Sequence, residues 1–408
     1  MTRRVPAVLL AIAVLGASAT MASAGPASAQ SGSEQTVKVG SILPIETGGG
    51  TVSSATTHEA LQASIKAFNK RSDSIQLELV LCDTKGDPNE EVKCAREMVD
   101  EGVVATLGDL TPANAAGVNE VLVPAGIARI GPQPAGVADY QSPVVFPFLA
   151  GAVGNYSTMG NELANQGKTK LALLRPDTGS AGALAPFISP AIEAGGAEIV
   201  VDIGIPNATA DYAPFVTAVT SAGADGVLFA VADKDAEQFL IAANQLNADF
   251  TVAVPAGSFT AGTLKELLPI TDGAVIIESL PAPSLSAKEF PGLKPFKKDM
   301  KASGNPALAP KNLRTTELRM WTAVLAFQKF TEGLDTVDAP SVLASVEAAQ
   351  DVDLDGLTPP WTPSNPGPTE LFQQFSQPYV WVMGFNGKKI TISPPAINAF
   401  AQFPGAKT

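Results

Sequence analysis

Short apolar runs alternate along the chain with longer segments in which apolar residues recur every three or four positions. The run VKVGSIL at 37–43 predicts a buried strand, and residues 56–70 have the spacing of an amphipathic helix. The same alternation predicts strands at 75–81, 103–107, 127–130, 170–174, 197–203, 226–231, 251–254 and 274–277, and helices at 88–100, 112–123, 155–166, 181–194, 212–222 and 236–246. This order is typical of parallel sheets covered by helices on both faces, and the break between residues 130 and 155 divides it into two doubly wound units.

The pattern changes after residue 283. The segments KEFPGLKPFKKDMKAS and LRMWTAVLAFQKFTEG predict helices, and a Pro-rich tract follows at 357–368. Asn386 and Gly387 then stand between two alternating apolar runs, which predicts a β-hairpin. A hairpin that follows a helical insertion cannot simply extend the second unit, so we expect the chain to cross between the units more than once.

The first thirty residues predict an export signal. Arg3 and Arg4 precede an apolar run that is too short to span a bilayer, and small residues then lead to Gln30. We expect residues 1–29 to be a signal peptide cleaved near Ala29, by either the general or the twin-arginine route. No cysteine lies near that point, so we expect no lipid anchor. The mature protein is therefore predicted to be secreted or periplasmic.

Composition excludes several kinds of partner. The chain has 27 Lys and Arg against 40 Asp and Glu, for a formal net charge of -13. Such an acidic protein gains nothing from the phosphates of nucleic acid, so we expect no nucleic-acid partner. The single histidine, His58, leaves too few ligands for a zinc tetrad. We expect neither a metal nor a cofactor.

Cys82 and Cys94 are the only two cysteines of the chain. Between them, the stretch DPNE at 87–90 predicts a helix start with Asp87 as N-cap and Glu90 completing a capping box. Cys82 would then end a strand, and Cys94 would lie in the helix that packs back across it. An oxidising compartment favours a disulfide over the alternative of two reduced, buried thiols.

Motifs that resemble those of enzymes stand in the wrong context. Asp-Thr-Gly-Ser at 177–180 spells the aspartic-protease tetrapeptide, but the chain has no second copy to share a proton with it. Gly-Lys-Thr at 167–169 follows a helix and precedes a strand, the reverse of a phosphate-binding loop. One histidine also provides little general-base capacity. We therefore expect binding without catalysis and predict that the protein is not an enzyme.

The chain resembles the type I periplasmic solute-binding family, in particular its leucine/isoleucine/valine-binding group, which serves ABC importers of branched-chain amino acids. The resemblance covers about residues 37–392. It rests on KVGSILPIETGGG, CDTKGDPNEEVKCAREMVDEGV, ATLGDLTPANA, VPAGIARIGPQP, ATADYAPFVTAVTSAGADGVLFA and the late FNGK hairpin, in this order. The cysteine pair of the family is commonly a disulfide, in agreement with the argument above.

The resemblance implies an α/β fold of two Rossmann-like lobes with parallel central sheets, three interlobe crossings and a ligand cleft between the lobes. We expect lobe one at 37–147 plus 283–352, lobe two at 151–279 plus 360–403, and crossings near 147–150, 280–283 and 354–360. In such sheets the ligand lies beyond the carboxyl ends of the strands.

The loops at those strand ends supply the candidate ligand-binding residues, which are Thr111, Gln133, Asp177, Ser180, Asp233 and Phe259. Each has a structural alternative: the first two can cap turns, the two aspartates can cap helices, and the last two can be ordinary loop residues. His58 starts the first helix beside the cleft and is a further candidate. Trp361 and Tyr379 either line the cleft edge or pack within lobe two.

The same loops lack groups with which amino-acid binders of the family hold a zwitterion. The hydroxyl-rich run after residue 107 is reduced to Thr111, and Ala256 stands where an acid for the ligand ammonium is expected. A buried ammonium without a partner is costly. We therefore predict a small aromatic or aliphatic acid, or another weakly polar solute, which a monomer delivers to a membrane permease and its ATPase. A branched-chain amino-acid binder and a sensing receptor of the same fold remain alternatives.

Overall fold

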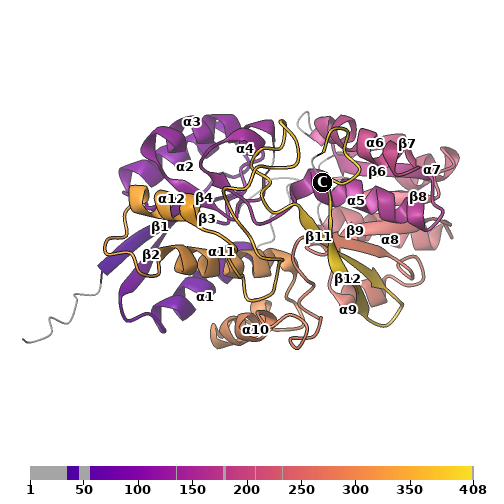
Figure 1. The fold of residues 1–408 in the computed structure, drawn as a ribbon. Helices are drawn as coiled ribbons and strands as arrows, with labels where there is room; N and C mark the ends of the chain where they lie inside the picture. The colour runs from indigo at the N-terminus through magenta and orange to yellow at the C-terminus, as the bar shows by residue number, and fades with distance from the viewer. Residues whose placement is uncertain are drawn as a thin grey trace, which may run out of the picture.

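The computed structural model describes residues 35–45, 56–134, 136–177, 181–206, 208–231 and 233–406. The predicted signal peptide, residues 1–29, lies outside this part of the chain. Two α/β lobes stand side by side, each built on its own sheet (Figure 1). This confirms the predicted fold class.

Lobe one is built on a five-stranded parallel sheet with the order β2-β1-β3-β4-β5. Its strands are β1 (Gln35–Leu43), β2 (Ile75–Asp83), β3 (Ala105–Leu107), β4 (Ala128–Ile130) and β5 (Val145–Phe146). Its first helices are α1 (Thr57–Asn69), α2 (Pro88–Asp100), α3 (Ala115–Ala125) and α4 (Val137–Gln141). Helices from much later in the sequence complete the lobe, namely α10 (Leu293–Ala302), η2 (Pro306–Leu308), α11 (Thr315–Thr331) and α12 (Ala339–Ala348).

Lobe two is built on a seven-stranded sheet with the order β12-β11-β10-β9-β8-β6-β7. The parallel strands are β6 (Lys170–Pro176), β7 (Glu198–Ile205), β8 (Gly226–Phe229), β9 (Thr251–Pro255) and β10 (Val275–Glu278). The late hairpin of β11 (Tyr379–Phe385) and β12 (Ile390–Asn398) adds antiparallel to β10. The helices are α5 (Gly151–Asn165), η1 (Ala181–Ala183), α6 (Leu184–Ala194), α7 (Ala213–Ser221), α8 (Asp233–Gln245) and α9 (Ala261–Glu266).

The chain passes between the lobes three times: after β5, after β10 and after α12. The first two passages are hydrogen-bonded to each other, because the Ala150 backbone N–H donates to Ser279 Oγ at 2.8 Å. In the third passage Val352 and Trp361 form an isolated antiparallel bridge. The hairpin returns to lobe two only after this passage, as the sequence predicted (Figure 1).

The cysteine pair forms the predicted disulfide, with 5.6 Å between the Cα atoms of Cys82 and Cys94. Asp87 caps α2 and accepts from the backbone N–H groups of Asn89 and Glu90 at 2.8 and 3.1 Å. The predicted capping box is wrong, because the Glu90 side chain does not bond back to the start of the helix. Its carboxylate pairs with Lys93 at 2.8 Å, one turn along the exposed face of the helix.

The third helix of lobe one begins later than predicted. The apolar spacing predicts a helix over 112–123, whereas α3 begins at Ala115. Asn114 is its N-cap and accepts from the Gly117 backbone N–H at 3.0 Å, which satisfies a helix-end donor at that position. Residues 110–114 therefore stay in the loop that follows β3.

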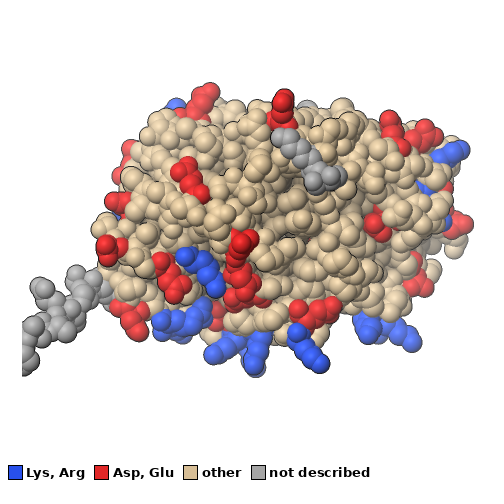
Figure 2. Space-filling view, in the orientation of Figure 1, with Lys and Arg blue, Asp and Glu red and all other residues tan. Residues whose placement is uncertain are grey.

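Charge is unevenly distributed on the surface. Figure 2 shows acidic side chains scattered over both lobes, whereas lysines and arginines gather along the lower margin. Figure 1 places α10 at this margin, and α10 carries the exposed lysines Lys294, Lys298 and Lys301. The described helices include none that is long and apolar enough to cross a membrane.

Candidate functional site

The two lobes meet where the start of a lobe-one helix faces loops of lobe two. Arg314, the N-cap of α11, forms an ion pair with Asp233, the first residue of α8. Beside this pair, a Cβ added to Gly257 after β9 would lie 3.2 Å from Thr316 Cγ2. We call this region the interlobe site and define it by Asp233, Gly257, Ser258, Arg314, Thr316 and Glu317.

The first turn of α11 fixes the lobe-one side of the interlobe site. Glu317 accepts from the Arg314 backbone N–H at 2.8 Å, which closes a capping box around the helix start. Glu317 also accepts from the Thr56 hydroxyl and lies 3.7 Å from Arg314 Nη2. The backbone and guanidinium of Arg314 are therefore both held by the helix that carries them.

Asp233 is an unusual carboxylate. Burial raises its pKa to about 6, against the lowering effects of Arg314 and of a hydrogen bond to Ser258. Glu317 and Tyr156 also lie within electrostatic reach of Asp233. Its side chain is 33% exposed, so burial is partial, and the raised pKa means that the ionised carboxylate is less stable here than in water.

A second arginine of α11 ties the lobe-one loops together. Arg319 is buried, and its Nη1 donates to the carbonyl oxygens of Gly108 at 2.7 Å and Gly131 at 3.4 Å. Burial lowers the pKa of Arg319 to about 10, while Asp109, Glu278 and Glu317 oppose the shift. One guanidinium thus joins the ends of β3 and β4.

Two of the residues whose carbonyls accept from Arg319, Gly108 and Gly131, must be glycines for steric reasons. Gly108 has a φ of +67°, and a Cβ there would lie 2.5 Å from Met320 Sδ. Gly131 has a φ of +64°, and its Cβ would lie 2.3 Å from the ring of Phe148. Only glycine allows both the left-handed backbone and the close approach.

Behind these loops lies a fully buried charge cluster. Arg129 pairs with Asp139 at 2.7 Å and with Asp109 at 3.1 Å, and all three side chains are inaccessible to solvent. Asn119 accepts from Arg129 at 2.9 Å. Asp109 also accepts from the Ile42 backbone N–H at 3.0 Å, which connects the loop after β3 to the end of β1. The cluster therefore holds the strand ends of lobe one in a fixed arrangement.

The predicted lobe-one residues belong to this supporting structure. Thr111 is buried, and its hydroxyl accepts from Arg129 Nη2 at 3.0 Å. Gln133 is half-buried, and its backbone N–H donates to the Asp109 carbonyl at 2.8 Å. His58 is half-buried in the first turn of α1. The role of each in ligand contact stays a prediction.

The predicted lobe-two residues are dispersed. Asp177 is exposed at the end of β6, and Ser180 lies outside the described residues. Phe259 is 3% exposed and packs in the main hydrophobic core. Asp233 is the predicted residue that faces the other lobe directly.

The two aromatic candidates differ in exposure. Trp361 is fully buried, with its ring against Phe148 and Phe330 at centroid distances of 5.9 and 5.7 Å. It therefore packs in the core, although Phe330 belongs to α11 of lobe one and not to lobe two as predicted. Tyr379 is 38% exposed at the start of β11.

Sequence reasoning missed Arg314, Glu317, Arg319 and Glu278. The candidates came from loops that follow strands, whereas Glu317 and Arg319 lie in α11, Arg314 is the N-cap of this helix and Glu278 ends β10. Glu278 is half-buried and accepts from Asn155 Nδ2 at 2.9 Å. A useful signal was available, because charged residues in an otherwise apolar helix are rarely buried without a partner.

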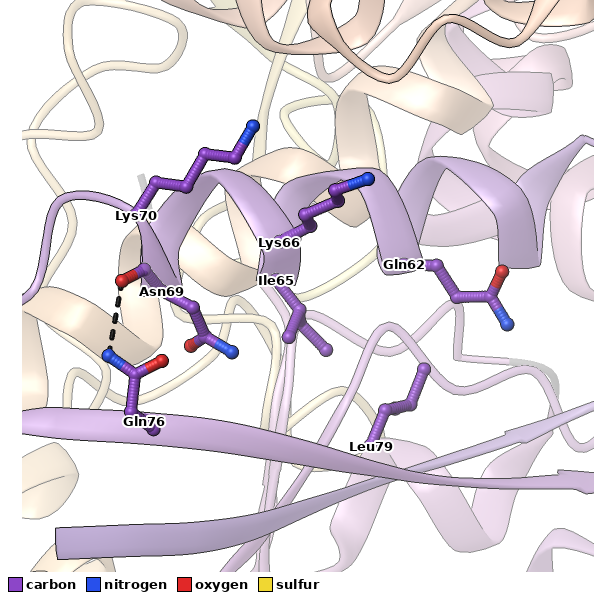
Figure 3. A pocket seen from close by; sticks show the side chains of 7 residues that line it. All are labelled: Gln62, Ile65, Lys66, Asn69, Lys70, Gln76 and Leu79. Carbon is purple, nitrogen blue, oxygen red and sulfur yellow. Dashed lines mark hydrogen bonds between the residues drawn. The ribbon is translucent and has the colours of Figure 1, made fainter.

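Two surface hollows lie away from the interlobe site. One, of about 370 Å³, is a groove between α1 and the edge strand β2. Figure 3 shows Ile65 and Leu79 facing each other across it, while Lys66 and Lys70 extend away from the strand. The other, of about 590 Å³, is lined mainly by the irregular segment at 363–374. Within the described ranges, no group of three or more His, Cys, Asp and Glu side chains is arranged to hold a metal ion.

A family model described as periplasmic binding protein matches residues 36–380, and the chain belongs to this family. The family consists of solute-binding proteins, which act outside the cytoplasmic membrane. No curated protein matches the sequence.

Solved structures share the fold at low identity. A solute-binding protein of an ABC transporter from R. palustris, in complex with 4-hydroxybenzoate, has 18% identity and a TM-score of 0.70, over 90% of this chain and 99% of that chain. Another from R. palustris, in complex with benzoate, has 16% identity and a TM-score of 0.68, over 89% and 97%. A leucine-binding protein from Thermotoga maritima has 15% identity and a TM-score of 0.67, over 89% and 99%.

Proposed function

We propose that the protein is the extracytoplasmic receptor of an ABC importer and binds a small solute between its lobes. The observation that carries this proposal is the pairing of Arg314 with Asp233, because it brings charged groups of both lobes together at the ends of the sheets. Ligands of open α/β sheets bind at the carboxyl ends of the strands. A solute there would contact both lobes and stabilise the closed form.

The crossings near 147–150, 280–283 and 354–360 are proposed as the hinge. Hinges are a few connecting residues that absorb a change in backbone angles, while the bodies they join stay rigid. The disulfide and the buried charge cluster support a rigid lobe one. In this proposal a monomer is exported with its signal peptide removed near Ala29, closes on the solute, and delivers it to a membrane permease with its ATPase.

A small aromatic or aliphatic acid is the proposed ligand class. Two cations, Arg314 and Arg319, lie at the lobe-one side of the site, and either suits a carboxylate. Two proteins of the same fold hold benzoate and 4-hydroxybenzoate. The loops are also poor in hydroxyl groups, as the sequence shows at Gly131 to Gly136.

A branched-chain amino acid is the second candidate, and one observation favours it. Asp233, Glu278 and Glu317 provide carboxylates at or near the interlobe site, any of which suits a ligand ammonium. The loop after β9 has Ala256 where an acid was expected, but these three residues come from other elements.

A thermal-shift screen separates the two ligand classes. We expect benzoate, 4-hydroxybenzoate and related acids to raise the melting temperature of the mature protein, since a ligand that binds only the folded state stabilises it by mass action. Leucine, isoleucine and valine should have smaller effects at the same concentration. A shift with the amino acids alone would contradict the proposed ligand class, and no shift with any small solute would contradict the receptor function.

A further inference from the structure

The guanidinium of Arg314 is only partly satisfied in this structure. Its Nη1 atom pairs with Asp233 across the lobes, and Nη2 lies 3.7 Å from Glu317. Its Nε atom is buried and has no hydrogen-bond partner among the residues that the structure describes. A buried donor without a partner is costly. The hydroxyl of Thr316, two residues further along the chain, is also buried and has no hydrogen-bond partner among the described residues.

A carboxylate satisfies a guanidinium best through two parallel hydrogen bonds. Asp233 belongs to α8 of lobe two. Its carboxylate accepts from one guanidinium nitrogen, Nη1 of Arg314. A free carboxylate is not restrained by a lobe and can accept from Nη1 and Nη2 together, which requires Asp233 to leave Nη1.

We propose that Asp233 occupies, in the ligand-free protein, the place on Arg314 that the carboxylate of the solute takes on binding. Asp233 is then an internal competitor, and Arg314 is the residue that selects for acids. This inference rests on the proposed solute-binding function and adds the chemistry that sets its ligand class. The poor stabilisation of the Asp233 carboxylate by its surroundings agrees with its displacement.

Other charged groups near Asp233 fit this assignment. Glu317 of α11 is held by the Arg314 backbone N–H and by the Thr56 hydroxyl, so it is anchored within lobe one. Tyr156 of α5 is in electrostatic reach, and burial together with the charges of Glu278 and Asp233 raises its pKa, so it stays neutral. Ser258 bonds to Asp233 from within lobe two. Among the described residues, Arg314 is therefore the cation that pairs with Asp233 from the other lobe.

The test uses benzoate and its uncharged analogue benzamide as probes, with calorimetric titration at pH 7.5. We expect Asp233→Asn to raise the affinity for benzoate at least about fivefold, because benzoate no longer has to displace an ionised carboxylate from Arg314. Its affinity for benzamide should change less than about twofold. Adding Arg314→Gln to Asp233→Asn should abolish the gain.

A matched control has the same charge change inside one lobe. Asp202 pairs with Arg175 at 2.8 Å within lobe two, and Asp202→Asn should leave benzoate affinity as in the wild type. Circular dichroism and melting curves verify that each variant folds, and Asp233→Ala provides a second variant. The inference is overturned if neither Asp233 variant binds benzoate more tightly than the wild type, or if benzamide gains equally. Those results leave the receptor function standing, since that is decided by the solute screen on the wild type.

Discussion

At the scale of single residues, lobe one is organised by buried charges and not by apolar contacts alone. Arg129 has two carboxylate partners, Asp109 after β3 and Asp139 in α4. Arg319 donates to three backbone carbonyls that follow β3 and β4, those of Gly108, Asp109 and Gly131. Burying such groups is costly unless every one is paired. Their presence here is explained by what they position, which is the loops that follow β3 and β4.

Arg129→Met should be strongly destabilising. The substitution leaves Asp109 and Asp139 buried without their cation, and breaking a buried pair in this way typically costs about 3–5 kcal/mol. Urea unfolding followed by circular dichroism measures the change. As a control, Lys38→Met removes an exposed pair with Glu101 and should leave the unfolding midpoint almost unchanged. Equal effects of the two variants would contradict the importance of burial.

At the scale of elements, the edge of lobe one depends on a covalent link between β2 and α2. β2 is an edge strand, paired on one side with β1. Cys94 of α2 is fully buried in a small cluster with Ile42 and Met98, and the disulfide attaches this helix to the end of the edge strand. Asp87 fixes the start of the same helix.

Replacing both cysteines by serine should therefore lower the free energy of unfolding of lobe one by about 3 kcal/mol, the loop-closure value for a short loop. Differential scanning calorimetry would record the lower melting temperature. The wild type treated with a reducing agent should melt close to the double variant, because both lack the same restraint. An unchanged melting temperature on reduction would show that packing of α2 alone holds the edge.

At the scale of the whole molecule, the ion pair of Asp233 and Arg314 joins the two lobes directly. Asp233 and Arg314 are 81 residues apart in sequence and meet only because the chain returns to lobe one after β10. In the proposed mechanism, closure changes the environment of these groups, so ligand binding and protonation are linked through them. We therefore expect a pH dependence of ligand binding that neither lobe would show alone.

We expect the affinity for benzoate to increase as the pH falls from 7.5 to 5.5. The raised pKa of Asp233, about 6, means that its carboxylate becomes protonated over this range and releases Arg314. A free carboxylic acid with an ordinary pKa of about 4 stays largely ionised. The gain is at most about 25-fold, the ratio of protonated fractions of Asp233 at the two pH values. Titrations at both pH values should show this gain in the wild type and not in Asp233→Asn.

Local pattern was sufficient for the parts of the fold that depend on neighbouring residues. Alternating apolar runs predicted the strands, Asp87 and Pro88 predicted the start of α2, and Asn386 with Gly387 predicted the hairpin, because these signals act within a few residues. The three passages between lobes required the family resemblance in addition, and the strand order was not predicted. Helix starts were less certain, as α3 shows, because a polar cap and an apolar spacing compete there.

The sequence by itself determined the two α/β units, the disulfide and the acidic character. Only the tertiary structure decided which side chains occupy the interlobe site. Arg314 and Arg319 lie far along the chain from the loops they contact, and their helix has the apolar spacing of a core element. Contacts over such separations depend on how the lobes pack, and periodicity describes only one element at a time.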